Sequence, residues 1–552
     1  MTRFYRCESR LVVMVAAIGL AWVTQTAEAD FAIGKVVNMG AVINSPAEDG
    51  SPSISADGLE LYFGSQRSEG YGWWDIWVSR RPHIDAEWGK PTNLGPEIND
   101  WRLEGATSLS EDGLSLYYNA TRDGSFDIYL TTRATRDDDW GTPAKIRPFQ
   151  SGFGTVPDIS SDGLQLYFAD HSGGFLPGGF GSNDLWVMTR PTLSDPWGAP
   201  ANLGGRVNSP SVEYNPCISA DGLVLFFSSE RPGGLGSSDV WVAGRTTTDD
   251  DWGLPVNLGP LINTSYGDGG PSISTDGRTL YFHSARPGGH GEGDLWQAGI
   301  EPILDFNGDG RVDGFELSRM ADHWGTDDSA CDIGPMPWGD GVVGLEDLRV
   351  LADHIGEELD DATLLAHWKL DETEGMVAHD DVERNHGTVV GTPTWLPAGG
   401  AAEGALEFDG GTLLTSDFAL DPATGPFSVL VWVQGGAPGQ TIVSQQGSTD
   451  WLSIHTATGT LTGGLRGVGR FGTPLITDAT LLNGRWHRVA FTWDGTSRKL
   501  YVDDHCVAED TQSELASSNT KLLIGADKDM TPGSFWTGLI DDVRIYSRAV
   551  QP

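Results

Sequence analysis

The chain has 552 residues, and its 77 acidic against 35 basic residues give a formal net charge of −42. So strong a negative charge disfavours nucleic acids and anionic membranes as partners, and it favours solubility and the uptake of cations. A high content of Gly and Trp with a modest fraction of charged residues indicates many short strands joined by tight turns, and the length indicates more than one domain.

Residues 1–29 have the pattern of a secretion signal. A segment with three arginines precedes an apolar run at 11–23, and 27–29 form a small-x-small cleavage site before Asp30. The apolar run is too short to span a bilayer comfortably, and no later run approaches its length. We therefore expect a secreted protein without membrane insertion, in an extracytoplasmic compartment that the pattern does not specify.

From residue 30 to 301 the chain repeats one pattern five times. Each repeat has an Asp-Gly turn between two alternating apolar runs, as in 52–63, and then an Asp, an apolar residue and Trp or Tyr. The alternation predicts hairpins, and a spacing of about 50 to 60 residues suits a four-stranded propeller blade. Because the second Asp occurs in all five repeats, we expect a structural hydrogen-bonding role for Asp75, Asp127, Asp184, Asp239 and Asp294.

The fifth repeat lacks its last strand, because the chain runs from Trp296 almost directly into the next motif. The missing piece lies near the N-terminus, where residues 33–44 align with 88–99. The first strand should therefore complete the last blade and hide both sheet edges. We predict a mainly β fold that begins with a closed five-bladed β-propeller. The repeats resemble TolB-type propeller repeats, which are relatives of WD repeats, and the resemblance implies a fold but no single activity.

Acids and arginines recur at two matched positions of the repeats. Four repeats carry both, and the third has Gly154 and Ser172 instead. Both positions belong to one edge of a blade, so we expect acid–arginine pairs that either fix the loops around the channel mouth or line a funnel for a cation or sugar. The loop aromatics Trp73 and Trp74 would stack on a sugar there or pack between blades. The paired candidates are Asp49, Glu104, Glu213, Asp268, Arg67, Arg122, Arg231 and Arg286.

The segment 305–316 has the residues of a calcium loop at every constrained position. Oxygen-bearing side chains occupy loop positions 1, 3, 5, 9 and 12, Gly310 permits the turn at position 6, and a backbone carbonyl serves at position 7. We therefore predict calcium binding by Asp305, Asn307, Asp309, Arg311, Asp313 and Glu316.

A second half-motif follows the helix expected after Glu316, and it departs from the calcium pattern. Positions 1 and 3 are Met336 and Trp338, although Asp332 lies far enough upstream to curl back as a substitute ligand. Occupied and empty sites are both open here, with Asp332, Asp340, Val342 and Asp347 as the candidate ligands. His323 and His354 recur on the two exit helices, where a single His is expected to pack or cap.

Two loop-plus-helix halves without entry helices resemble a type I dockerin over residues 302–357. This resemblance implies a cohesin-like partner. The late loop positions are 314–315 and 345–346, which lack the hydroxyl pairs of well-known cellulosomal examples. A structural spacer is therefore the alternative for this module.

After an acidic linker, 358–363, strands are predicted at 427–433, 486–493 and 499–502. The phrases at 405–410 and 538–546 resemble the laminin-G-like, concanavalin-type jelly roll, and we assign residues 364–552 to it. The resemblance implies a two-sheet sandwich that often binds one calcium ion and sometimes glycans. Asp380, Asp409 and Asp541 are the acidic candidates for that ion.

Nucleophile, zinc-protease and phosphate-loop motifs are absent from the sequence, so paired carboxylates in the propeller mouth are the one catalytic option. A catalytic pair should be unique, whereas these acids recur in four repeats. The sequence thus favours a secreted calcium-binding protein that attaches to a glycan or an extracellular protein. The alternative is a polysaccharide-degrading glycoside hydrolase with a catalytic propeller and a carbohydrate-binding C-terminal domain.

Overall fold

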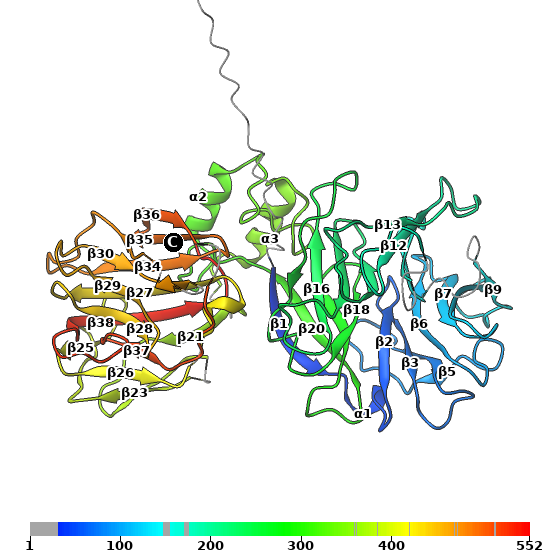
Figure 1. Cartoon of the computed structure of the whole chain (residues 1–552), viewed down its shortest axis with the longest axis horizontal. Coiled ribbons are helices and arrows are strands. Elements are labelled where there is room, and N and C mark those ends of the chain that lie inside the picture. Colours follow the sequence, from blue (N-terminus) through cyan, green and yellow to red (C-terminus); the bar gives the residue numbers. More distant parts are fainter. Residues whose placement is uncertain are drawn as a thin grey trace, which may run out of the picture.

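The computed structural model describes residues 31–552 except 147–154, 171–175, 358, 360, 383–384, 419, 468–469, 472 and 513–514. The predicted secretion signal, Gly154 and Ser172 lie outside these residues. Two β lobes are joined by a small helical module (Figure 1). None of the helices in the described part of the chain is long and apolar enough to cross a membrane.

The first lobe is a five-bladed propeller, as predicted. Blade one comprises β2 (Asp49–Ile54), β3 (Glu60–Ser65), β4 (Asp75–Arg80) and β5 (Thr92–Asn93), and blade two comprises β6 (Glu104–Leu109), β7 (Ser115–Ala120), β8 (Asp127–Thr132) and β9 (Ala144–Lys145). Blade three comprises β10 (Thr155–Ile159), β11 (Gln165–Ala169), β12 (Leu185–Thr189) and β13 (Ala201–Asn202). Blade four comprises β14 (Glu213–Ile218), β15 (Val224–Ser229), β16 (Asp239–Gly244) and β17 (Val256–Asn257), and blade five β18 (Asp268–Ile273), β19 (Thr279–Ser284), β20 (Asp294–Pro302) and β1 (Phe31–Asn38).

The N-terminal strand β1 closes the ring, which confirms the prediction from the missing strand. It pairs antiparallel with β20 and sets Asn38 opposite Trp296, just as blade one sets Asn93 opposite Trp77. The Asn38 amide donates to the Asp294 carboxylate at 2.9 Å. A short helix, α1 (Gly40–Ile43), then leads into blade one.

The repeated aspartates before Trp or Tyr hold the loops, as expected of a structural residue. In blade one the buried Asp75 carboxylate accepts from the backbone N–H groups of Tyr71 at 2.5 Å and Gly72 at 2.9 Å, and from the Asn93 amide at 2.8 Å. Blade two has Lys145 in place of the asparagine, and its ammonium lies 2.5 Å from Asp127. The repeated aspartate thus binds either an asparagine amide or a lysine ammonium of the last strand of its blade.

A second ring of contacts links the inner strands around the propeller axis. The side chain of one blade accepts from a backbone N–H of the next, as in Ile54 N–H to Ser272 Oγ at 3.2 Å and Ile218 N–H to Asp158 Oδ2 at 2.7 Å. Asp158 also accepts from the Ser108 hydroxyl at 2.8 Å and lines a polar axial cavity of about 30 Å³. Burial raises the pKa of Asp158 to about 7.

The helical module contains α2 (Gly314–Asp322) and α3 (Leu345–His354), with no helix before either loop. A capping box starts α2, because the Asp313 side chain accepts from Phe315 N–H while Glu316 accepts from the Asp313 N–H. The module contacts the propeller at the face that carries the Asp-Gly turns. There the Trp338 indole N–H donates to Asp221 at 2.8 Å.

The second lobe is a two-sheet jelly roll, as predicted. Sheet one has the order β24 (Thr394–Leu396), β25 (Ala405–Asp409), β38 (Thr537–Tyr546), β27 (Phe427–Gly435), β34 (His487–Trp493), β35 (Ser497–Val502) and β36 (His505–Thr511), and β21 (Leu364–Trp368) also pairs with β38. Sheet two has the order β22 (Val377–Ala378), β23 (Gly387–Val390), β26 (Leu413–Ser416), β37 (Leu522–Ile524), β28 (Thr441–Gln445), β29 (Thr449–Ile454), β30 (Leu461–Gly463) and β33 (Leu475–Ile476). The pair β31 (Arg466–Gly467) and β32 (Arg470–Phe471) and the 3₁₀ turn η1 (Pro422–Thr424) complete it.

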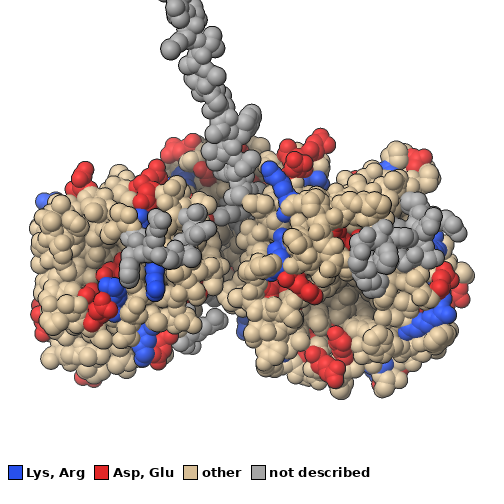
Figure 2. Space-filling model, viewed as in Figure 1, with Lys and Arg blue, Asp and Glu red and all other residues tan. Residues whose placement is uncertain are grey.

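The core of the jelly roll lies between its two sheets, where Trp368, Trp451 and Trp536 are fully buried. On the face of the whole molecule drawn in Figure 2, acidic and basic groups are interspersed, and the described basic residues form no continuous patch there.

Candidate functional site

The predicted first calcium loop folds around the carboxylate of Asp305. Asp305 is 1% exposed, and its two oxygens accept from the backbone N–H groups of Gly308 at 2.7 Å, Asp309 at 3.1 Å and Gly310 at 2.8 Å. Gly310 has φ +83°, the left-handed conformation that position 6 of such a loop requires. The loop conformation expected from the sequence is therefore present.

Two acids of this loop, Asp305 and Glu316, are buried. Glu316 is fully buried, its Oε2 accepts from the Asp313 N–H at 2.8 Å, and its Oε1 has no partner. Burial raises the pKa of the Asp305 and Glu316 carboxyls, and the nearby Asp309 carboxylate adds to both shifts. Across the described residues, His, Cys, Asp and Glu side chains nowhere gather in threes closely enough to hold a metal ion by themselves. The Asp305 and Glu316 carboxylates thus accept hydrogen bonds from backbone N–H groups, and only Glu316 Oε1 of their oxygens is buried without a partner.

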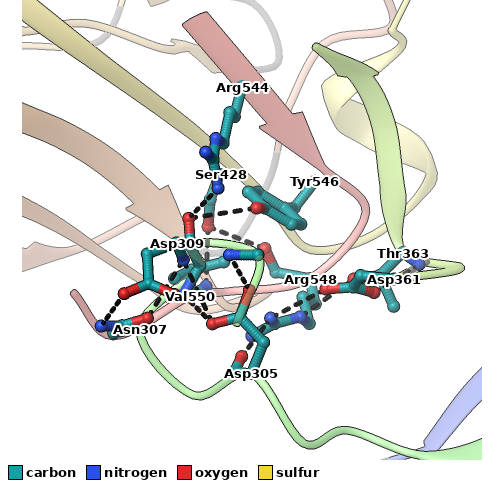
Figure 3. A network of polar contacts seen from close by, with 12 residues as sticks. Asp305, Asn307, Asp309, Asp361, Thr363, Ser428, Arg544, Tyr546, Arg548 and Val550 are labelled. Carbon is teal, nitrogen blue, oxygen red and sulfur yellow. Dashed lines mark hydrogen bonds and ion pairs between the residues drawn. The ribbon is translucent and has the colours of Figure 1, made fainter. Parts of the chain in front are cut away.

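The same loop packs against sheet one of the jelly roll (Figure 3). The Gly308 carbonyl accepts three hydrogen bonds, from Arg488 Nη2, Arg544 Nη1 and Tyr546 OH, each at 3.1 Å. A Cβ at Gly308, where φ is +72°, would lie 2.9 Å from a methyl group of Val550. Glycine is therefore required both for the turn and for this close approach. We call this contact, made by Gly308, Arg488, Arg544 and Tyr546, the joint.

Residues on either side of the loop extend the joint. Arg548 donates to the Asp305 carbonyl at 2.5 Å and lies 3.1 Å from the Asp361 carboxylate. Leu359 N–H donates to the Gly310 carbonyl at 3.0 Å. The segment predicted as a linker, 358–363, therefore takes part in the joint through its described residues.

In the second half-motif, Asp332 does curl back onto its loop. Its two oxygens accept from the N–H groups of Asp340 at 2.8 Å and Gly341 at 2.6 Å, and burial raises the pKa of Asp332 to about 7. Asp347 accepts from Ile333, Gly334 and Gly344 N–H groups. The Val342 N–H donates to the Asp340 carboxylate at 3.1 Å. The carboxylates of Asp332, Asp340 and Asp347 in this half thus accept hydrogen bonds from backbone N–H groups.

The two helix histidines lie at helix ends. His323 is the C-cap residue of α2, and its Nδ1 lies 2.8 Å from Asp328. His354 Nδ1 lies 2.9 Å from Glu357. Each histidine thus contacts one nearby carboxylate, and only His323 is itself a helix-capping residue.

At the propeller mouth, three of the four expected acid–arginine pairs form. Arg67 lies 2.6 Å from Asp49, Arg231 lies 3.2 Å from Glu213, and Arg286 lies 2.9 Å from Asp268. Each arginine also donates to a backbone carbonyl of the loop beside it. The acids are buried, so these side chains fix the loops and do not line an open funnel.

The expected fourth pair, Glu104 with Arg122, is the exception. Arg122 donates to the carbonyls of Glu97 and Ile98, and no ion pair joins it to Glu104 in this described blade. Glu104 Oε1 and Arg122 Nε are buried without partners, and burial raises the pKa of Glu104 to about 7. The aligned serines of the other three blades are replaced here by Ala120, which supplies no hydroxyl to bridge acid and arginine.

The two predicted loop tryptophans differ in environment. Trp74 packs over the sheet, since a Cβ at Gly64 would lie 2.8 Å from its ring. Trp73 points outward and is 66% exposed. Only Trp73 is therefore available to a ligand.

The three acids proposed for the jelly-roll ion serve three different turns. Asp380 accepts from His367 and Asn385 N–H groups at 2.8 Å, and the exposed Asp409 accepts from Gly411 and Thr412 N–H groups at 2.9 Å. Asp541 is buried, accepts from the N–H groups of residues 401–402, and keeps one oxygen without a partner. Burial raises the pKa of Asp541 to about 6. The three carboxylates thus bind three separate sets of backbone N–H groups, and their hydrogen bonds do not join them into one ion site.

A cleft of about 490 Å³ lies where the three parts meet. Phe31 and Leu261 of the propeller, Phe306 of the module and Leu420 of the jelly roll are among its mostly apolar lining. Its two basic residues already have partners, since Arg548 donates to the Asp305 carbonyl and Arg319 donates to Gln551. The cleft therefore has the volume of a ligand site but few free polar groups to orient a ligand.

The residues of sheet one that hold the loop, and the carboxylate on the propeller axis, were not predicted from the sequence. Arg488 and Arg544 lie in ordinary alternating strands, so no sequence signal marks them. Asp158 was detectable, because the aligned residue is Ser or Cys in the other four blades.

These observations define a multidomain β protein in which a five-bladed propeller and a concanavalin A-like jelly roll are joined by a small helical module. Residues 408–552 match the family model of the concanavalin A-like lectin/glucanase superfamily. A comparison with the curated proteins gives no match.

Solved structures that match this chain include domain 4 of AbnA, a GH43 extracellular arabinanase from Geobacillus stearothermophilus (18% identity, 34% of this chain, 94% of that chain, TM-score 0.25). TolB from Acinetobacter baumannii matches at 17% identity over 49% of this chain and 63% of its own, with a TM-score of 0.32. A Trypanosoma rangeli sialidase mutant matches at 14% identity over 91% of this chain and 82% of its own, with a TM-score of 0.32.

Proposed function

We propose that this chain is a secreted protein that binds glycans outside the cytoplasm. The observation that carries the proposal is the match of residues 408–552 to a superfamily of lectins and glucanases. The joint occupies the outer face of sheet one, through Arg488, Arg544 and Tyr546. Sheet two takes no part in those contacts, so its outer face is the one offered to a polysaccharide.

The loop at 305–316 acts in this proposal as a calcium-dependent clamp between the lobes. Its donors are hard oxygens, and the buried unpartnered Oε1 of Glu316 suits a cation. Asp305, Asn307, Asp309, Asp313, Glu316 and the Arg311 carbonyl would hold the ion. When bound, the ion supplies positive charge that balances buried carboxylates, while the chain's own Gly308 carbonyl keeps the jelly roll in register.

A glycoside hydrolase is the second candidate, and one observation favours it. Glu104 has an unpartnered oxygen, and its pKa of about 7 would suit a general acid. However, Glu104 is 0% exposed, so a glycosidic oxygen cannot reach it in this structure. The aligned acids Asp49, Glu213 and Asp268 are held by arginines. Binding without hydrolysis is therefore the better supported function.

A cohesin-like partner remains a prediction. At the late positions of the two loops, Phe315 is 37% exposed and Leu345 is 54% exposed. The joint uses the first positions of the first loop instead, so these side chains are open to a partner. Pull-down with a cohesin domain, compared with the Phe315→Ala and Leu345→Ala variants, would test this expectation.

A glycan array probed with the full mature chain tests the main proposal. We expect binding to at least one neutral or acidic polysaccharide and no release of reducing sugar from it. Silence of the whole chain across the array would refute the binding proposal, and reducing-sugar release lost in Glu104→Gln would favour the hydrolase. N-terminal sequencing of the secreted protein should begin at Asp30.

Calorimetry tests the calcium clamp. We expect at least one calcium site in the wild type, its loss in Asp305→Ala, and its retention in Asp322→Ala, which removes an exposed acid of α2 outside the loop. Chelation should lower the Tm of the wild type, because a ligand that binds only the folded state stabilises it. Equal calcium binding by Asp305→Ala and wild type would overturn the assignment.

A further inference from the structure

Two tryptophans and a tyrosine from neighbouring loops are exposed on the propeller face that carries the acid–arginine pairs. Trp101 is 74% exposed, Trp73 is 66% exposed and Tyr71 is 54% exposed. Large apolar rings in water are unfavourable, and large exposed apolar groups that lie together mark binding surfaces. More than half of the surface of each ring stays exposed.

The segments that carry these rings are bound to each other. Trp73 N–H donates to the Arg102 carbonyl at 3.0 Å, and Glu104 N–H donates to the Trp74 carbonyl at 2.9 Å. A Cβ at Gly72 would lie 2.5 Å from the carbonyl oxygens of Asp100 and Arg102. The two loops are therefore in direct contact, and their rings are presented on a fixed backbone.

The other blades show that the fold does not need tryptophan at these positions. Two residues before the repeated aspartate, where blade one has Trp73, the other blades have Ser125, Ser182, Ser237 and Glu292. Two residues after the repeated asparagine, where the chain has Trp101, the aligned residues are Pro46, Pro210 and Ser265. Trp73 and Trp101 thus replace small or polar residues or proline at positions that recur in the other blades, and both lie near the junction of blades one and two.

Charges beside the rings indicate the kind of ligand. Glu69 is in the loop of Tyr71, and Asp100 precedes Trp101. The Arg102 guanidinium is stacked on the Trp101 ring, 4.8 Å from its centroid, and donates to the Thr121 carbonyl at 3.2 Å. With two acids against one cation, this surface disfavours a uronic acid, while its carboxylates can accept hydrogen bonds from the hydroxyl groups of a neutral sugar.

We propose that Tyr71, Trp73 and Trp101 form a stacking platform for a neutral oligosaccharide of pyranose units. The apolar faces of such sugars pack on aromatic rings, and the carboxylates beside them orient the hydroxyl groups. The inference rests on the proposed glycan-binding function and places one binding site on the propeller, on the face opposite to the Asp-Gly turns that contact the helical module.

Titration calorimetry with the full chain tests the platform, using cellohexaose, xylohexaose, mannohexaose and laminarihexaose as probes and an oligogalacturonate of the same length as the acidic control. Trp73→Ala and Trp101→Ala should each weaken binding of a neutral hexaose by about 3- to 10-fold, the effect of losing one aromatic contact. Trp101→Tyr should retain most of the affinity. Ile84→Ala is the matched control, because it removes an exposed apolar side chain beside the Gly58 turn of the same blade.

The outcomes separate the platform from the wider function. Loss of affinity in both tryptophan variants, with Ile84→Ala unchanged, supports the platform. Undiminished binding of a neutral hexaose by Trp73→Ala/Trp101→Ala would overturn it while leaving glycan binding to the jelly roll. Preference for the oligogalacturonate would overturn the neutral ligand class. Silence toward every one of these sugars would overturn the platform, whereas the glycan array decides the wider binding function.

Discussion

Substitution of Ala120 by Ser should stabilise the propeller, because blade two lacks a hydroxyl that three other blades use. Ser65, Ser229 and Ser284 accept from the Nε of the adjacent arginine at 2.8, 3.0 and 2.7 Å. In blades four and five the same hydroxyl also donates to the paired acid. Ala120 occupies the aligned position opposite Glu104, and two buried polar atoms are left without partners.

The magnitude follows from those two atoms. A hydrogen bond to a charged group contributes about 1.5–3 kcal/mol, and burying the new hydroxyl costs about 1–3 kcal/mol, so two such bonds leave a net gain of about 2 kcal/mol. For a propeller of this size the Tm should rise by roughly 4–8 °C. Burial raises the pKa of Glu104 to about 7, so its carboxylate lowers stability above pH 7 and is relieved by protonation below it. A new donor favours the carboxylate, so the gain should be larger at pH 8 than at pH 5.

Calorimetric and urea unfolding at the two pH values measure this gain. Ala169→Ser is the control for a hydroxyl added to a buried alanine of the second strand of a blade, since blade three has Asp170 at the aligned place and Gly154 and Ser172 instead of the acid and the arginine. We expect no gain there. An equal effect of Ala120→Ser and Ala169→Ser, or the same gain at pH 5 and pH 8, would refute the reasoning.

Three further changes test other contacts. Burial raises the pKa of Asp158 to about 7, so wild-type stability should increase as the pH falls from 8 to 5; Asp158→Asn should flatten this dependence of the urea midpoint. Arg544→Ala removes one donor to Gly308 and should weaken lobe docking by about 1–2 kcal/mol, seen as faster proteolysis between the lobes. Asn38→Ala removes the amide contact with Asp294 and should cost about 1 kcal/mol in thermal unfolding.

Repetition made the propeller predictable. The alignment of residues 33–44 with 88–99 predicted that β1 completes blade five, and Asn38 takes the place opposite Trp296 that Asn93 takes opposite Trp77. Five copies of one pattern also separate structural residues from exceptions. The prediction of a pair between Glu104 and Arg122 failed because it was inferred from two positions, whereas a serine at a third position holds the arginine in the three blades where the pair forms.

The contacts of the joint could not be predicted from the sequence. Gly308 and Tyr546 are 238 residues apart, and neither belongs to a repeat that would relate them. Their contact depends on how two independently folded surfaces fit, which no local pattern encodes. Trp73 and Trp74 are adjacent in the sequence, yet one is exposed and the other packs on Gly64, because neighbouring residues point to opposite sides of an extended segment.

Closure of the propeller by β1 delays the completion of blade five until late in the synthesis of the chain. Phe31 pairs with Pro302, so the first described strand has its partner only after the whole array has been synthesised. At about 5–20 residues per second, the roughly 270 intervening residues take about 15–50 s to emerge. During that interval β1 and the inner blades present open backbone edges, which are sites for aggregation. The yield of correctly folded protein should therefore depend on how fast the fifth blade arrives, and slower synthesis should lower it.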